Sequence, residues 1–173
     1  GGTLTCTVGV YKIEADTNLG PNKIPCNLEI SLDPTITLYG HVWVTGNIII
    51  KNTARIEVAP SIGPNSLAII ADNQNASTTS GLVDLENSVV FTGSGGAGSQ
   101  VLVISQNGSA ENGGTNVAID IKNTVSGDLL LYAPHGKIDL QNSVNLKEVT
   151  AYKINLKNSA EVITEDEFKN RLN

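Results

Sequence analysis

A nine-residue pattern that occurs five times constrains the fold of this chain more than any other feature. The pattern is apolar-x-apolar-polar-Asn-Ser/Thr-apolar, and such self-similarity is typical of repeat architectures. Its copies are IIIKNTARI from Ile48, VDLENSVVF from Val83, IDIKNTVSG from Ile119, IDLQNSVNL from Ile138 and INLKNSAEV from Ile154. The apolar positions alternate as in a strand with one buried face, and the Asn-Ser/Thr pair interrupts them with residues that favour turns. Each copy therefore predicts a strand, a corner and a second strand.

A third apolar run lies between consecutive copies. These runs are LAIIA from Leu67, VLVIS from Val101, LLLYA from Leu129 and EVTAY from Glu148. The corner asparagines are 35, 36, 19 and 16 residues apart, so one coil takes 16 to 20 residues plus loops. Three strands per coil predict an all-β, right-handed parallel β-helix.

The corner asparagines stack along the axis of such a helix. Each amide can donate to one neighbour and accept from the other, which predicts a structural ladder and no catalytic role. The five residues are Asn52, Asn87, Asn123, Asn142 and Asn158.

The chain divides into three parts at this level. Residues 1–27 are irregular and predict an N-terminal cap, residues 28–163 the β-helix, and residues 164–173 a short C-terminal capping helix or a tail. A cap is needed because the end of a solenoid exposes apolar interior and unpaired strand edges. Trp43 is interpreted as a core or cap residue.

Cys6 and Cys26 are the only cysteines, and both lie in the expected cap. As a disulfide closing a loop of about 20 residues they would stabilise the fold by roughly 3 kcal/mol, which suits an exported protein. The alternative is a pair of free thiols. A metal site is less favoured because His41 and His135 are far from both cysteines in sequence.

Composition excludes several functional classes. With 11 Lys and Arg against 17 Asp and Glu, the net charge of -6 disfavours binding to nucleic acid or to an anionic membrane. No apolar run approaches the ~20 residues that span a bilayer, so no membrane insertion is expected of this fragment. The start at Gly1-Gly2 without Met suggests a mature or truncated ectodomain, which we expect to be extracellular or on a cell surface.

Three acidic residues occupy the same place in successive repeats. Asp84, Asp120 and Asp139 each follow the first apolar position, and neighbouring coils are about 4.8 Å apart, so a column is expected. The column is either a solvated face, a weak calcium site, or part of a carbohydrate-active β-helix enzyme, which needs paired carboxylates. No catalytic constellation or cofactor motif is present, so a non-enzymatic role is favoured.

The third run of each coil has apolar residues at both sets of alternate positions. One of the two sets must therefore point outward, either the set named below or its neighbours. Such an apolar outer face is expected to be covered by other residues. The cover is either the chain's own loops, a partner protein or a second copy of the chain. The first set is Ala68, Ile70, Leu102, Ile104, Leu130 and Tyr132, and Tyr152 would continue it.

Polar insertions follow the third run on two successive coils. These loops, residues 72–81 and 105–117, should lie next to each other and are the best place for a binding site, with a glycan as one ligand. The alternative is that coil corners simply tolerate insertions.

The segments YGHVWVTGNIIIKN and LLLYAPHGKIDLQNSVNLKEVTAYKINLKNSAEV, with the Asn-Ser/Thr corners, resemble those of bacterial exported proteins that carry a β-helix behind a type IV pilin-like anchor. The resemblance covers residues 38 to 163, and its most specific part surrounds Tyr132 and Tyr152. It implies a cell-surface or pilus-associated ectodomain. More loosely, the fold is similar to that of pectin-acting lyases and hydrolases.

Taken together, these features predict a non-enzymatic structural or adhesive module of a cell surface or pilus. A self-assembling filament subunit and a carbohydrate-active enzyme are the alternatives.

Overall fold

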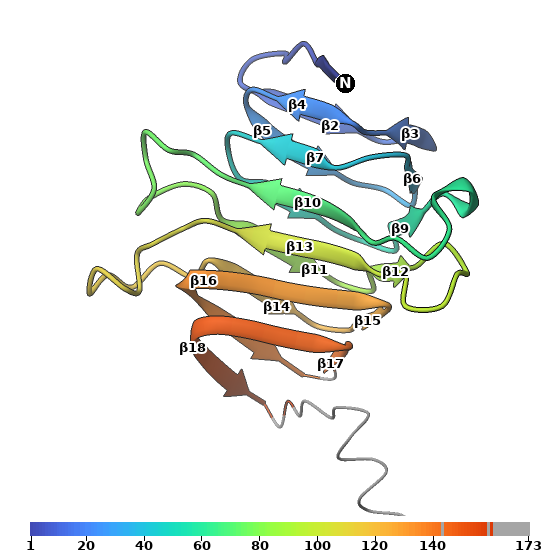
Figure 1. The fold of residues 1–173 in the computed structure, drawn as a ribbon. Helices are drawn as coiled ribbons and strands as arrows, with labels where there is room; N and C mark the ends of the chain where they lie inside the picture. Colours follow the sequence, from blue (N-terminus) through green and yellow to red (C-terminus); the bar gives the residue numbers. More distant parts are fainter. Residues whose placement is uncertain (143, 159, 161–173) are drawn as a thin grey trace, which may run out of the picture.

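The protein is an all-β parallel solenoid in a computed structural model that describes residues 1–142, 144–158 and 160 (Figure 1). Along most of the chain, each strand pairs in parallel with the strand three places further on, so that three strands complete one coil. The corners advance by 20, 35, 36, 19 and 16 residues per coil, as the spacing of the repeats predicts.

We number the three faces of the solenoid by the order in which a coil visits them. Face 1 contains β2 (Val10–Ile13), β5 (Asn27–Ile30), β8 (Ile48–Ile50), β11 (Val83–Glu86), β14 (Ile119–Lys122) and the second halves of β16 (Leu129–Gln141) and β18 (Glu148–Lys157). Face 2 contains β3 (Thr17–Leu19), β6 (Thr35–Leu38), β9 (Arg55–Val58), β12 (Val90–Thr92), β15 (Val125–Gly127) and β17 (Val144–Asn145). Face 3 contains β1 (Gly2–Thr3), β4 (Asn22–Ile24), β7 (Val42–Val44), β10 (Leu67–Ala71), β13 (Val101–Ser105) and the first halves of β16 and β18. A short 3-10 helix, η1 (Pro60–Ile62), follows β9.

The interior is a set of apolar columns that run along the axis. In one column on face 1 the register aligns Ile30, Ile50, Leu85, Ile121 and Leu140, all with 0% exposure. The next residue in this column, Leu156 of β18, is 54% exposed because β18 is the last strand that the structure describes. Inward residues thus fix the register, and the residues between them must form outward columns.

The solenoid begins earlier than the boundary at residue 28 that the sequence predicts. β2, β3 and β4 pair in parallel with β5, β6 and β7 and make a complete coil within residues 10–24. The prediction was wrong because these strands have only three or four residues, of which one each (Ile13, Leu19, Ile24) is buried. So few apolar positions give no readable alternation.

The predicted disulfide is confirmed. Cys6 and Cys26 are bonded, with their Cα atoms 6.4 Å apart. The bond fixes the segment between β1 and β2 to the residue that precedes β5. The predicted C-terminal helix at residues 164–173 lies outside the described residues.

The corner between faces 1 and 2 requires a left-handed backbone conformation. All five repeat asparagines have positive φ, between 52° and 75°. Amide hydrogen bonds join Asn52 to Asn87 at 3.3 Å, Asn87 to Asn123 at 3.3 Å and Asn123 to Asn142 at 3.4 Å. Asn tolerates this conformation better than other side chains with a Cβ atom, so the backbone explains the repeated residue and the ladder adds to it.

Leu32 occupies the same corner one coil earlier, with a φ of 67° and 55% exposure. Its neighbour Asp33 compensates in part, because the Asp33 carboxylate accepts hydrogen bonds from the hydroxyl and the backbone N–H of Thr53 at 2.6 and 3.3 Å. The leucine itself gains little from burial while its backbone is unfavourable.

Replacement of Asn87 should separate the two roles of the corner. We expect Asn87→Ala to lower the free energy of unfolding by about 1 kcal/mol, because a Cβ residue without a compensating side chain resists the left-handed region. Asn87→Gly should cost less, since glycine adopts this φ freely and loses only exposed amide bonds. If chemical denaturation gave equal losses of unfolding free energy for the two variants, the amide ladder, and not the backbone conformation, would account for the stability that Asn87 contributes.

The reverse substitution should stabilise the protein. We expect Leu32→Asn to raise the free energy of unfolding by up to about 1 kcal/mol, since Asn is better suited to positive φ than an exposed leucine. Leu32→Ala is the matched control and should give no such gain. A loss of stability in the Asn variant would mean that Leu32 makes a contribution that its exposure does not reveal.

Candidate binding face

The outer side of face 3 carries two apolar columns. In the first, the register aligns Lys23, Trp43, Ile70, Ile104, Tyr132 and Thr150. In the second it aligns Ala68, Leu102, Leu130 and Glu148, and His41 precedes this column and accepts a hydrogen bond from the Ala68 N–H at 3.0 Å. Face 3 therefore has an apolar centre, with charged or polar residues at both ends of each column.

Burial decides between the two orientations that the sequence left open. In the neighbouring set, Ile69, Val103 and Leu131 are at most 1% exposed and belong to the interior. Ala68, Ile70, Leu102, Ile104, Leu130 and Tyr132 therefore point outward. Ala68 is only 5% exposed, the next four are half-buried, and Tyr132 is 41% exposed.

Tyr152 does not continue this column. Thr150 pairs with Tyr132, and the register then shifts between Ala133 and Lys137 of β16. Tyr152 lies opposite this bulge at the corner between faces 3 and 1, where it is 58% exposed. The prediction that grouped Tyr152 with face 3 was wrong because the bulge places three residues of β16 against a single residue of β18.

Loops flank face 3 on both sides (Figure 1). Residues 72–81 and 106–117 leave the ends of β10 and β13 on one side, and the segments that precede these two strands lie on the other. Hydrogen bonds join the two segments that precede β10 and β13. The Ser99 hydroxyl donates to the carbonyl of Asn65 at 2.8 Å, and the Ser94 hydroxyl donates to the carbonyl of Gly63.

The two loops after β10 and β13 pack against each other, as the sequence predicts. Asn107 is fully buried and its amide donates to the Ser80 carbonyl at 2.8 Å, while the Asn116 amide donates to the Thr78 carbonyl at 2.8 Å. The Gly108 N–H also donates to the Ser77 carbonyl at 2.7 Å. The later loop thus holds the earlier loop in place through hydrogen bonds, which favours a defined structure over two independent insertions.

The loop of residues 72–81 is also anchored to the coil beneath it. Asn47 accepts hydrogen bonds from the Leu82 N–H at 3.0 Å and from the Ser80 hydroxyl at 3.2 Å, and the Asp72 N–H donates to the Val44 carbonyl at 2.9 Å. A loop held at both ends and along one side loses little conformational entropy when it binds a ligand.

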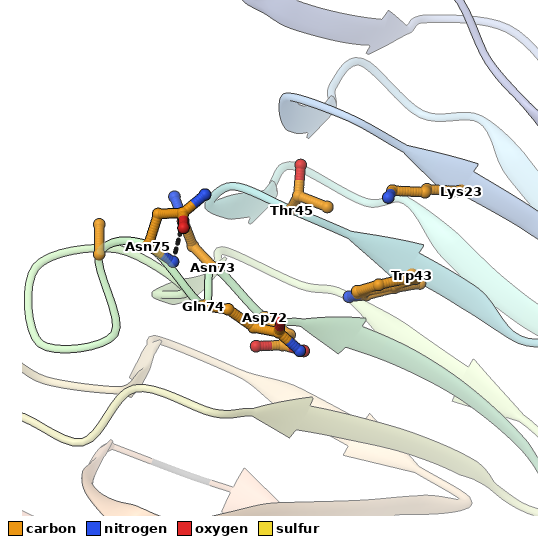
Figure 2. A pocket seen from close by; sticks show the side chains of 8 residues that line it. Lys23, Trp43, Thr45, Asp72, Asn73, Gln74 and Asn75 are labelled. Carbon is orange, nitrogen blue, oxygen red and sulfur yellow. Dashed lines mark hydrogen bonds between the residues drawn. The ribbon is translucent and has the colours of Figure 1, made fainter.

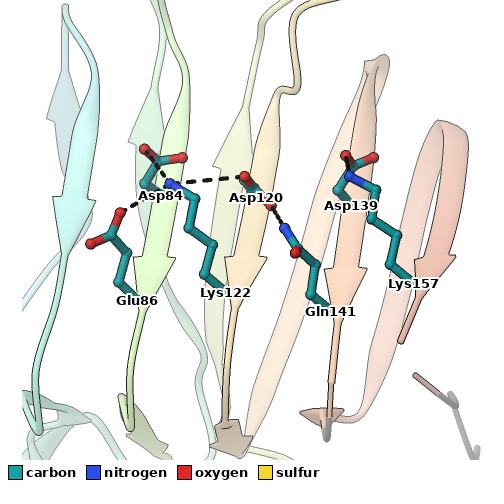
Figure 3. A network of polar contacts seen from close by, with 7 residues as sticks. All are labelled: Asp84, Glu86, Asp120, Lys122, Asp139, Gln141 and Lys157. Carbon is teal, nitrogen blue, oxygen red and sulfur yellow. Dashed lines mark hydrogen bonds and ion pairs between the residues drawn. The ribbon is translucent and has the colours of Figure 1, made fainter. Parts of the chain in front are cut away.

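The acidic column predicted from the sequence is present on face 1, where the register aligns Asp84, Asp120 and Asp139 (Figure 3). Lys122 Nζ lies 3.3 Å from Asp84 and 3.0 Å from Glu86. Asp120 accepts a hydrogen bond from Gln141 at 2.8 Å.

Asp139 is 2% exposed and is the most buried carboxylate of the column. Its carboxylate accepts a hydrogen bond from the Asn155 amide at 2.9 Å and another from Lys157 Nζ at 2.6 Å. Each aspartate of the column therefore accepts a hydrogen bond from a side chain of the following coil.

Three groups of this network have shifted pKa values, and for Lys157 the hydrogen bond to Asp139 raises the pKa. Burial raises the pKa of Asp84 above its usual value, and the nearby Lys122 ammonium only partly opposes the shift. For Lys122, burial lowers the pKa, but hydrogen bonds with Glu86 and Asp84 outweigh it, so the pKa is raised and the side chain stays charged.

This arrangement disfavours the calcium site that the sequence left open. Calcium takes six to eight oxygen ligands, whereas ammonium groups already lie against Asp84 and Asp139. In residues 1–142, 144–158 and 160, no group of three or more His, Cys, Asp or Glu side chains is arranged to hold a metal ion.

Trp43 is the residue of face 3 that the sequence interpretation placed incorrectly. It is 36% exposed and points outward between the buried Val42 and Val44. The alternation in HVWVTG carries this signal, because two inward valines leave the residue between them outside. Trp43 therefore belongs to the candidate binding face and not to the core.

Within the described part of the chain, no helix has both the length and the hydrophobicity needed to cross a lipid bilayer. Comparison with protein-family models, with curated proteins and with solved structures finds no match for this chain.

The raised pKa of Asp84 gives a testable pH dependence. The folded protein holds a proton on Asp84 more readily than the unfolded chain, so ionisation of Asp84 lowers stability as the pH rises from below the unfolded pKa of about 3.9 through the folded value. Asn cannot ionise, so the Asp84→Asn variant lacks this loss. We therefore expect the free energy of unfolding of the variant, minus that of the native protein, to be larger at pH 7 than at pH 3. Thermal unfolding at both values measures this, and the opposite trend would mean that the Lys122 contact dominates.

Proposed function

We propose that this protein is a non-enzymatic adhesive or structural module, exported and carried at a cell surface or on a pilus, which contacts other macromolecules through face 3. The proposal includes a right-handed winding of the coils. A single observation carries it: face 3 is the side of the solenoid whose outward centre is apolar, while the charged column of face 1 pairs with itself.

The contrast between the two faces supports this role. On face 1 Lys122 and Lys157 turn toward carboxylates of the preceding coil, so their charges are largely compensated within the chain. On face 3 the outward residues Ile70, Ile104 and Tyr132 are aligned in one column and have no charged partner among their aligned neighbours. Exposed apolar patches with polar rims are typical of interaction sites.

The carboxylates do not favour the enzymatic alternative. A β-helix glycosidase or lyase needs carboxyl groups that are free to donate or accept protons at a substrate. Asp84, Asp120 and Asp139 are instead bonded to side chains of the next coil. The Cys6–Cys26 disulfide supports export, because disulfides persist in oxidising compartments.

A bead-adhesion assay tests the proposal. Beads that carry the protein would be washed over surfaces coated with mucin, with dextran and with the protein itself. We expect retention on at least one surface, and a loss of about tenfold for Ile104→Ser, corresponding to roughly 1.4 kcal/mol.

Ile49→Ser is the matched control, since Ile49 is also a half-buried outward isoleucine in mid-strand but lies on face 1. It should leave retention unchanged. Equal losses for the two variants, or no retention of the native protein on any surface, would contradict the role of face 3.

A further inference from the structure

A hollow lies where the first column of face 3 meets the loop of residues 72–81 (Figure 2). Lys23, Trp43 and Thr45 form one side, and residues 72–76 form the other. Its volume is about 430 Å³, which is within the range of small-molecule sites.

The strand side of the hollow presents hydrogen-bond donors on a rigid support. Lys23 Nζ lies 4.5 Å from the centre of the Trp43 ring, so the ammonium is held over the indole by a cation–π contact. Figure 2 shows the nitrogen-bearing edge of Trp43 and the amine of Lys23 both directed toward the loop. A ligand would therefore meet the indole N–H and the ammonium, with the edge of the ring beside them.

The loop side presents groups that can both donate and accept. Among the described residues, the carboxylate of Asp72 and the amides of Gln74 and Asn75 have no hydrogen-bond or ion-pair partner. Asn73 is engaged differently, since its amide donates to Ser80 and its carbonyl oxygen accepts from the Asn75 N–H at 3.2 Å in each case. The bonds of Asn73 shape the loop and leave the next two polar side chains free for a ligand.

This combination identifies the class of ligand. An anion would meet the Asp72 carboxylate, a cation would meet the Lys23 ammonium, and an apolar ligand would leave the amides of the loop unpaired. A neutral sugar fits each group, because every hydroxyl both donates and accepts while the C–H faces of the ring pack against the indole edge and the lysine stem.

We propose that the hollow between Trp43 and residues 72–76 binds a neutral sugar residue of a glycan. The inference rests on the proposed function of face 3 as a contact surface, and it names the ligand at one end of that surface. The support from Asn47 and Asn107 described above holds the loop in its binding conformation before the sugar arrives.

Trp43 provides a direct readout, because it is the only tryptophan of the protein. Its indole N–H gives a single signal in a ¹H–¹⁵N spectrum. The probes are the methyl glycosides of glucose, galactose, mannose and N-acetylglucosamine, with glucuronate and choline as charged controls. We expect at least one neutral glycoside to shift the indole signal saturably at millimolar concentration, and neither charged probe to do so.

Gln74→Ala and Asn75→Ala should each weaken that binding about five- to tenfold, the effect of one or two lost hydrogen bonds, while the indole signal itself remains. Gln100→Ala is the matched control, because Gln100 directly precedes β13, at the opposite end of the face 3 strands from the loop of residues 72–81. It should bind like the native protein.

Two results would overturn the inference: no saturable shift with any neutral glycoside up to about 100 mM, a limit of roughly 1.4 kcal/mol in binding free energy, or unchanged affinity in both loop variants. Failure here, with bead retention still sensitive to Ile104→Ser, would reject the sugar site and keep the role of face 3. Failure of both assays would reject the proposed function itself.

Discussion

The in-register parallel pairing of successive coils is the interaction on which the rest of this structure depends. Once buried residues such as Ile50, Leu85 and Ile121 are stacked, every residue between them is placed in an outward column. A shift of one residue would exchange the two sets and expose the whole interior, so the register is strongly specified. The outer surface of the protein is thus a direct consequence of how its core is packed.

The columns then differ in what their members can do for one another. On face 1, carboxylates and ammonium groups of adjacent coils are close enough to pair, and the partly buried Lys122 lies within 3.9 Å of three carboxylates. On face 3, adjacent outward residues are apolar and can only stack. The same register therefore produces a face 1 whose charged side chains pair within the chain and a face 3 whose apolar side chains remain available for contact with another molecule.

The sequence predicted the coil spacing, the strand positions of the repeats and the adjacency of the two long loops, because all three follow from the period of the pattern. It did not predict the coil at residues 10–24, whose strands have one buried residue each. Nor did it predict the position of Tyr152, which depends on a bulge in the neighbouring strand. The sequence also did not predict the hollow beside Trp43, because its two sides come together only through the path of the loop.

Engineered cysteines would test the central claim, that β10 and β13 pair in the register that aligns Ile70 with Ile104. Ile70 and Ile104 are paired across β10 and β13, whereas Val103 points into the core from the adjacent position. In the folded protein we expect Ile70→Cys with Ile104→Cys to oxidise to a disulfide, because paired neighbours lie at a bridgeable distance. Ile70→Cys with Val103→Cys should not, and peptide mapping distinguishes either product from Cys6–Cys26. Bridging in the second pair instead of the first would show that the register is shifted by one residue, which would contradict the account of face 3.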